Sequence, residues 1–186
     1  MISMEIFNSI SRFGIITIIL HWLSAILVVT LFTLGLWMVN LDYYDPNYQT
    51  APDLHKSLGI TFFLILIVRV LFRLWQVSPR ALSHSTFENK LAKTIHIMMY
   101  LLMLMIPVSG YLISTGDGRG IMWFGLLEVP APSATSISAD LAGNVHLYLA
   151  WMLITLVSLH ALAGLKHWLI DKDKTLQRMF GLKSGK

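Results

Sequence analysis

Three long stretches of the chain contain no Asp, Glu, Lys or Arg, and they constrain the fold more than any other feature. They run over residues 13–41, 94–116 and 141–165. Each exceeds the roughly 20 residues that an α-helix needs to cross about 30 Å of hydrocarbon. A fourth apolar stretch reaches membrane length only if Arg69 and Arg73 lie inside the helix. The sequence therefore predicts four membrane-spanning helices, at about 15–40, 54–76, 92–114 and 140–169.

Composition supports an all-α membrane protein and excludes several other classes. Charged residues make up 13% of the chain, against about 25% in ordinary soluble domains. The chain has no cysteine, which excludes a disulfide scaffold, thiolate-ligated iron–sulfur clusters and a cysteine nucleophile. We expect a single four-helix domain over residues 12–180, surrounded by lipid and without a nucleic-acid partner.

Positive charge is distributed very unevenly between the two sides of the predicted membrane. Twelve of the fourteen Lys and Arg residues fall on one side, and the loops of the other side hold only Lys56 and Arg119. Because Lys and Arg are enriched in cytoplasmic segments, both termini are expected in the cytoplasm. The first apolar stretch lacks a small-residue cleavage site, so a cleaved signal peptide is not expected.

Boundary signals accompany the third helix and the C-terminal segment. Ser85 and Glu88 have the spacing of a capping box ahead of the third helix. Pro107 lies inside that helix, where neighbouring helices can tolerate a kink. The segment after residue 171 carries apolar residues among its cations, and it is predicted to form a short amphipathic element at the inner leaflet.

Histidines in the predicted spans point to a metal centre. His146 and His160 are 14 residues apart on the fourth span, so they lie within about 40° of each other and about 21 Å apart along the helix axis. His21 on the first span lies at about the depth of His160, and these two can face each other in the inner leaflet. His55 and His146 can meet in the outer leaflet. His96 is nearer the interface, and we rank it below His21 as a partner of His160.

Paired imidazoles that project inward from facing helices can hold a haem iron from both sides. With both axial positions filled, the iron favours one-electron transfer over oxygen binding. Two such haems about 20 Å apart would allow electrons to cross the bilayer. Small residues such as Gly59 and Gly143 lie close to these histidines; they either admit a flat macrocycle or serve ordinary helix packing.

Two arginines and a further histidine, His167, are additional candidate site residues. Arg69 and Arg73 project from the same stripe of the second span as His55, and buried cations need anions, which haem propionates would supply. Snorkelling to cytoplasmic headgroups explains Arg73 equally well. His167 lies seven residues beyond His160 and is a candidate to bind a quinone headgroup, although an ordinary interfacial histidine fits as well.

Taken in order, these segments resemble the bacterial cytochrome b561 family, which is related to the cytochrome b subunits of membrane-bound nickel–iron hydrogenases. The resemblance covers residues 12 to about 180 and rests on His21-Trp22-Leu23, the run from Asp53 to Gly59, Arg69 with Arg73, Asn144-Val145-His146, Leu159-His160-Ala161 and Asp171-Lys172-Asp173. It implies a protein of the bacterial inner membrane with two haem b groups, one on His21 and His160 and the other on His55 and His146. It also implies electron exchange with ubiquinone. Superoxide oxidation coupled to ubiquinone reduction is an activity attributed to the family.

The electron donor on the outer side is the least determined part of this interpretation. Lys56 directly follows His55, and with Arg119 it could bring superoxide to the outer haem. The outer loops also hold six acids, so a cationic or neutral donor is the more natural partner.

Two other functions remain open from the sequence. The chain could be the membrane anchor of a larger dehydrogenase. A haem-free metal or proton transporter is the alternative of another class, but the interiors of the spans lack the carboxylates that such pathways usually use.

Overall fold

The computed structural model describes residues 5–82, 85–132 and 138–181. Its long helices are α1 Ile15–Met38, α2 Thr50–Trp75, α3 Thr86–Thr115 and α4 Ala139–Leu169. A short hairpin, β1 Ile121–Trp123 and β2 Leu127–Val129, separates α3 from α4, and a short helix, α5 Thr175–Met179, follows α4.

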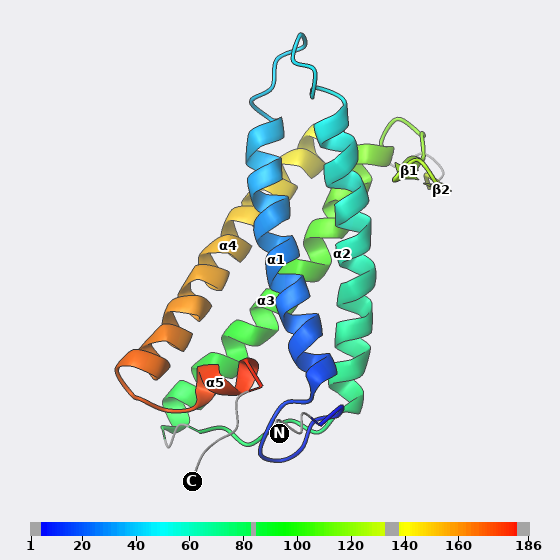
Figure 1. The fold of residues 1–186 in the computed structure, drawn as a ribbon. Helices are drawn as coiled ribbons and strands as arrows, with labels where there is room; N and C mark the ends of the chain where they lie inside the picture. The colour runs from blue at the N-terminus through cyan, green and yellow to red at the C-terminus, as the bar shows by residue number, and fades with distance from the viewer. Residues whose placement is uncertain (1–4, 83–84, 133–137, 182–186) are drawn as a thin grey trace.

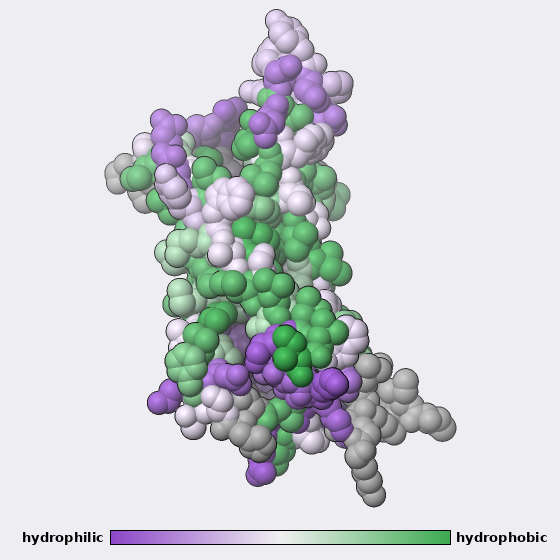
Figure 2. Space-filling view, turned by 90° about the vertical axis from the view of Figure 1, so that its left-hand side faces the viewer, coloured by the Kyte–Doolittle hydropathy of each residue, from purple (hydrophilic) through white to green (hydrophobic). Residues whose placement is uncertain are grey.

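The prediction of an all-α membrane bundle is confirmed. In the described part of the chain, four helices are long and apolar enough to cross a membrane. Figure 2 shows a hydrophobic band across the middle of one face of the molecule, with hydrophilic residues gathered toward both ends. Apolar side chains exposed around the middle of a bundle of this kind are the surface that contacts lipid.

Serine side chains cap the two longest helices at their N-termini. The Ser85 hydroxyl accepts a hydrogen bond from the backbone N–H of Glu88, and the Ser138 hydroxyl accepts one from Leu141. Such caps satisfy backbone donors that the first helical turn leaves free. As a result, α3 begins at Thr86, directly after the Ser85 cap.

The core of the bundle lies between the two histidine levels. In Figure 1, α1 and α2 lie side by side in front of α3 and α4, and the closest packing is within these two pairs. The buried cluster consists of Val28, Phe62, Leu66, Met99, Leu102, Met103 and Leu153. Leu153 is seven residues from both His146 and His160 on α4, so a packed apolar layer separates the two levels.

The two ends of the described chain lie at the same end of the bundle (Figure 1). There, the Trp22 indole N–H donates to the carbonyl oxygen of Met179 at 2.8 Å, and its ring lies 4.9 Å from that of Phe180. Asn8 bonds to Gln76 and Val77 beyond the end of α2. As far as residue 181, the C-terminal segment forms one short helix, and the last residue of that helix and the residue after it pack against α1, which carries His21.

Candidate metal centres

One histidine pair lies near the start of α2 and α4. The ring centroids of His55 and His146 are 6.3 Å apart, with an angle of 73° between the ring planes. The Nδ1 atom of His146 lies 3.0 Å from the Ser109 hydroxyl and 3.0 Å from the Ile106 carbonyl oxygen, both on α3. Among the described residues, Nδ1 of His55 is buried without a hydrogen-bond partner.

Two helix-interior glycines lie against this outer pair, and the sequence analysis missed both. A Cβ added at Gly110 would lie 3.2 Å from Cε1 of His146, and one at Gly35 would lie 3.3 Å from Cε1 of His55. Both glycines therefore let a neighbouring helix approach a histidine ring closely. A glycine inside a helix costs roughly 1 kcal/mol relative to alanine, and this cost was the one signal in the sequence that could have drawn attention to them.

The second pair lies at the other end of the bundle, on α1 and α4. The ring centroids of His21 and His160 are also 6.3 Å apart, with an interplanar angle of 65°. Nη2 of Arg69 lies 3.0 Å from Nδ1 of His21. The same guanidinium lies over the ring of Tyr100, 5.3 Å from its centroid; the sequence analysis did not single out this tyrosine.

His96 lies beside the inner pair. Its ring centroid is 5.1 Å from that of His160. The inner level therefore holds three histidines.

The ring separations of both pairs fit a metal held between two imidazoles. A metal–nitrogen bond of about 2 Å on each side, plus an imidazole radius of about 1.1 Å on each side, gives centroids about 6.2 Å apart. The separations of His21 from His160 and of His55 from His146 match this value. The 5.1 Å between His96 and His160 is about 1 Å too short for a metal between them.

Open space lies beside the outer pair. Gly59 is one turn from His55 on the same face of α2, and Gly143 is nearly one turn from His146 on α4. A Cβ added at either glycine would meet no heavy atom within 4 Å. Of the two alternatives that the sequence left open for these residues, room for a flat group therefore fits better than close helix packing.

The two candidate arginines differ in their surroundings. Arg69 is partly covered inside the bundle, and within the described ranges it forms no ion pair with a carboxylate. Arg73 is exposed, one turn further along α2. A desolvated guanidinium without an anion favours a site for a bound anionic group at Arg69.

His167 at the end of α4 sits between two carboxylates. Its Nδ1 lies 2.7 Å from Asp173 Oδ2 and 3.1 Å from Asp171 Oδ2, and Asp171 also pairs with Lys166 at 2.8 Å. Burial opposes ionisation of Asp173, but hydrogen bonds from Thr175 and His167 outweigh it and hold the pKa of Asp173 below its usual value. His167 thus has a fixed ring orientation.

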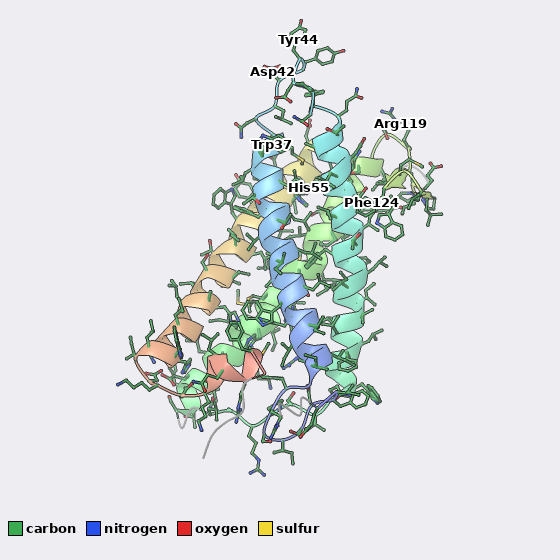
Figure 3. All side chains as sticks on the ribbon, viewed as in Figure 1. Trp37, Asp42, Tyr44, His55, Arg119 and Phe124 are labelled. Atoms are coloured by element: carbon green, nitrogen blue, oxygen red, sulfur yellow. The ribbon has the colours of Figure 1, made fainter. Side chains whose placement is uncertain are left out.

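Each of the two outer cations is paired with a nearby aspartate. Lys56 Nζ lies 2.7 Å from Asp53 Oδ1, and Arg119 Nε lies 2.7 Å from Asp117 Oδ2. Hydrogen bonds from Arg119 hold the pKa of Asp117 below its usual value. Figure 3 places Arg119 on the hairpin side of α2, apart from His55. The local positive charge expected beside the outer pair is therefore largely balanced.

A membrane four-helix bundle with histidine pairs at two depths has the architecture of a membrane-bound b-type cytochrome. A family model described as prokaryotic cytochrome b561 matches residues 12–182. The chain belongs to this family, as its motifs predicted. It is therefore a bacterial membrane protein of a haem b-binding family that acts in electron transfer.

Three relatives span almost the whole chain. Cytochrome b561 homolog 2 of Escherichia coli K12 is 47% identical over 183 residues, covering 97% of each protein. Probable superoxide oxidase CybB of Yersinia pestis is 32% identical over 177 residues, covering 94% of this chain and 98% of the relative. Cytochrome b561 homolog 1 of E. coli K12 is 26% identical over 174 residues, covering 91% and 97%.

Proposed function

We propose that this chain is a di-haem electron-transfer protein of the bacterial inner membrane that links an outer donor to the ubiquinone pool. The observation that carries the proposal is the common 6.3 Å centroid separation of His21 with His160 and of His55 with His146. Each bound haem b supplies a one-electron couple. If the purified protein contained no haem, a metal or proton transporter would be the better proposal for this chain.

Two features of the chain describe how the two candidate sites are separated: their spacing along α4 and the side chains packed between them. His146 and His160 lie 14 residues apart on α4, which corresponds to about 21 Å along the helix axis. The buried layer that includes Leu66 and Leu153 fills the bundle between them. These side chains exclude water from the interior, so that charge crosses the membrane as electrons and not through an aqueous path.

Specific side chains orient the rings and balance charge. Contacts from Ser109 and the Ile106 carbonyl to Nδ1 of His146 leave its Nε2 free for a metal. Arg69 now donates to Nδ1 of His21, and a haem propionate would offer this guanidinium a stronger, charged acceptor. We assign Arg69 to the inner haem and Lys56 to the outer one, with Arg73 as a second, exposed propionate partner.

We place the quinone headgroup at His167. The hydrogen bond between His167 and Asp173 occupies one ring nitrogen, which leaves the other nitrogen available to a quinone carbonyl. His167 also lies on the same face of α4 as His160. His167→Gln should slow the reoxidation of reduced protein by ubiquinone while the haem content stays unchanged. Equal reoxidation rates in the variant and the parent would move the quinone elsewhere.

Superoxide is the first donor to test. Support comes from the relative named probable superoxide oxidase. In such a reaction, two superoxide anions give two O₂ and two electrons, which together with two protons reduce ubiquinone to ubiquinol. The ion pairs of Lys56 and Arg119 argue for weak steering of an anion, so a neutral or cationic donor is the competing proposal.

Stopped-flow haem reduction by superoxide at several ionic strengths separates the two donors. Steering of an anion by the outer cations predicts a rate that falls as salt rises and falls further in Lys56→Gln. A rate that rises with salt, or that the substitution leaves unchanged, discards steering by the outer cations, and no haem reduction by superoxide at any ionic strength discards the superoxide route.

The cofactor count is tested directly. A reduced-minus-oxidised spectrum of the purified protein should show a b-type cytochrome, and pyridine haemochrome analysis should give two haems per chain. One haem per chain would contradict the di-haem proposal, and none would contradict the cytochrome function.

A further inference from the structure

The hairpin β1–β2 lies outside the bundle, against α2 (Figure 1). The Trp123 indole N–H donates to the Thr61 hydroxyl at 3.1 Å, and the backbone N–H of Phe124 donates to the Ser57 hydroxyl at 3.0 Å. Ser57 is about 200° around the helix from His55. The hairpin therefore packs on the flank of α2 that faces away from the histidine pair.

This flank of α2 continues below the hairpin as an apolar stripe. Leu64, Val68 and Leu71 lie within about 80° of Thr61 around the helix, and they are 48%, 52% and 61% exposed. In a membrane-spanning helix this exposed stripe contacts lipid. Leu64 lies about 4.5 Å further along the helix axis than Thr61. The hairpin thus ends where the lipid-contacting surface begins, and the two surfaces are continuous.

The hairpin itself presents apolar side chains on its free surface. The exposed fractions are 50%, 48%, 83% and 59% for Met122, Phe124, Leu126 and Leu127, respectively. Glu128 is the one charged residue in 121–129, and its side chain folds back against Gly120, where an added Cβ would clash with its carboxylate. Figure 3 shows Phe124 closer to the level of His55 than Arg119 is. Polarity therefore decreases from the base of the hairpin to its tip.

Part of the hairpin backbone is already hydrogen-bonded, which lowers the cost of placing non-helical chain at membrane depth. The strands pair from Ile121 with Val129 to Trp123 with Leu127. At the tip, the Leu126 N–H donates to the Trp123 carbonyl at 3.0 Å, and the Phe124 N–H donates to the Ser57 hydroxyl. These bonds reduce the cost of moving the apolar tip out of water.

We propose that the tip of the hairpin, residues 122–127, inserts into the bilayer at the boundary between headgroups and acyl chains, in the leaflet at the His55 end. Its partner is phospholipid, and Trp123 with its bonded N–H is the interfacial aromatic that such a position favours. The hairpin thereby anchors the segment between α3 and α4 to the membrane surface on the flank of α2.

The absence of cysteine makes this testable with single nitroxide labels. Leu126→Cys is labelled in the haem-loaded protein, reconstituted into phosphatidylcholine–phosphatidylglycerol vesicles, and its collision rates with O₂ and with a water-soluble nickel chelate are measured by power saturation. The matched control is Tyr44→Cys, in the loop between α1 and α2, where the side chain is 91% exposed (Figure 3). Insertion predicts a higher O₂-to-nickel ratio at 126 than at 44.

Two results would overturn the proposal. A ratio at residue 126 equal to that at 44 would place the tip in water. Low accessibility to both reagents would mean that protein, and not lipid, covers the tip. If Leu126→Cys does not fold, Leu127→Cys, at a position 59% exposed, serves as the second labelling site.

Discussion

Gly110→Ala should disturb the outer histidine pair while leaving the inner pair intact. The added Cβ would lie 3.2 Å from Cε1 and 3.4 Å from Nδ1 of His146, whereas non-bonded carbon atoms prefer about 3.5–4.0 Å. The ring must therefore retreat by about 0.3 Å or more, which exceeds the tolerance of about 0.2 Å on a metal–ligand distance. We expect partial loss of the outer haem.

The expected change in fold stability separates this strain from a general effect of alanine in a helix. Alanine gains about 1 kcal/mol over glycine in a helix interior, and overpacking costs about 1–3 kcal/mol. The net free energy of unfolding should thus be unchanged or fall by up to about 2 kcal/mol. Gly164→Ala is the control, because its Cβ would meet Leu176 at an ordinary 3.8 Å, and it should gain up to about 1 kcal/mol.

The assay combines haem content, by pyridine haemochrome, with the spectrum of each haem and with thermal unfolding of the purified protein. The inner haem of the same molecule serves as the internal reference. If Gly110→Ala keeps both haems with unchanged spectra and gains the same stability as Gly164→Ala, the close approach of Gly110 to His146 has no role in ligation.

Three further predictions address ligation, charge and topology. His160→Ala should lose the inner haem and His146→Ala the outer one, whereas His96→Ala should lose neither; loss of a haem in the His96 variant would contradict the pairing. Arg69→Gln should lower the midpoint potential of the inner haem, because a nearby cation favours the ferrous state; a redox titration with an unchanged inner midpoint would place Arg69 away from that haem. A reporter that is active only in the cytoplasm should be active when fused after Lys186, because the positive charge on that side predicts a cytoplasmic C-terminus. Activity of a periplasmic reporter at the same position would contradict this topology.

The four-helix bundle and the order of the candidate histidines along their helices could be predicted from the sequence, because both depend on regularities within single helices. The length of an uncharged run determines whether a helix spans the bilayer, and a rise of 1.5 Å per residue ranks His146 and His160 by depth. Neither inference needs knowledge of a neighbouring element.

Contacts between helices could not be predicted from spacings along one helix. The approach of Gly35 to His55 and of Gly110 to His146 depends on how α1 and α3 lie against their neighbours, which no spacing along one helix records. The proximity of His96 to His160 is likewise a contact between two helices, α3 and α4. Each strand of the hairpin has three residues, too few for an alternating pattern to appear.

Both candidate sites share α4, while their second ligands come from different helices. The spacing of His146 and His160 along α4 must therefore match the levels of His55 and His21 on two other helices. Deleting seven residues between His146 and His160 would keep both rings within about 20° of a common line, but it would move one of them about 10 Å along the axis from its partner ring, and inserting a single residue would turn one ring away by about 100°. The length of α4 between its two histidines is thus fixed by the two helices that supply the partner rings.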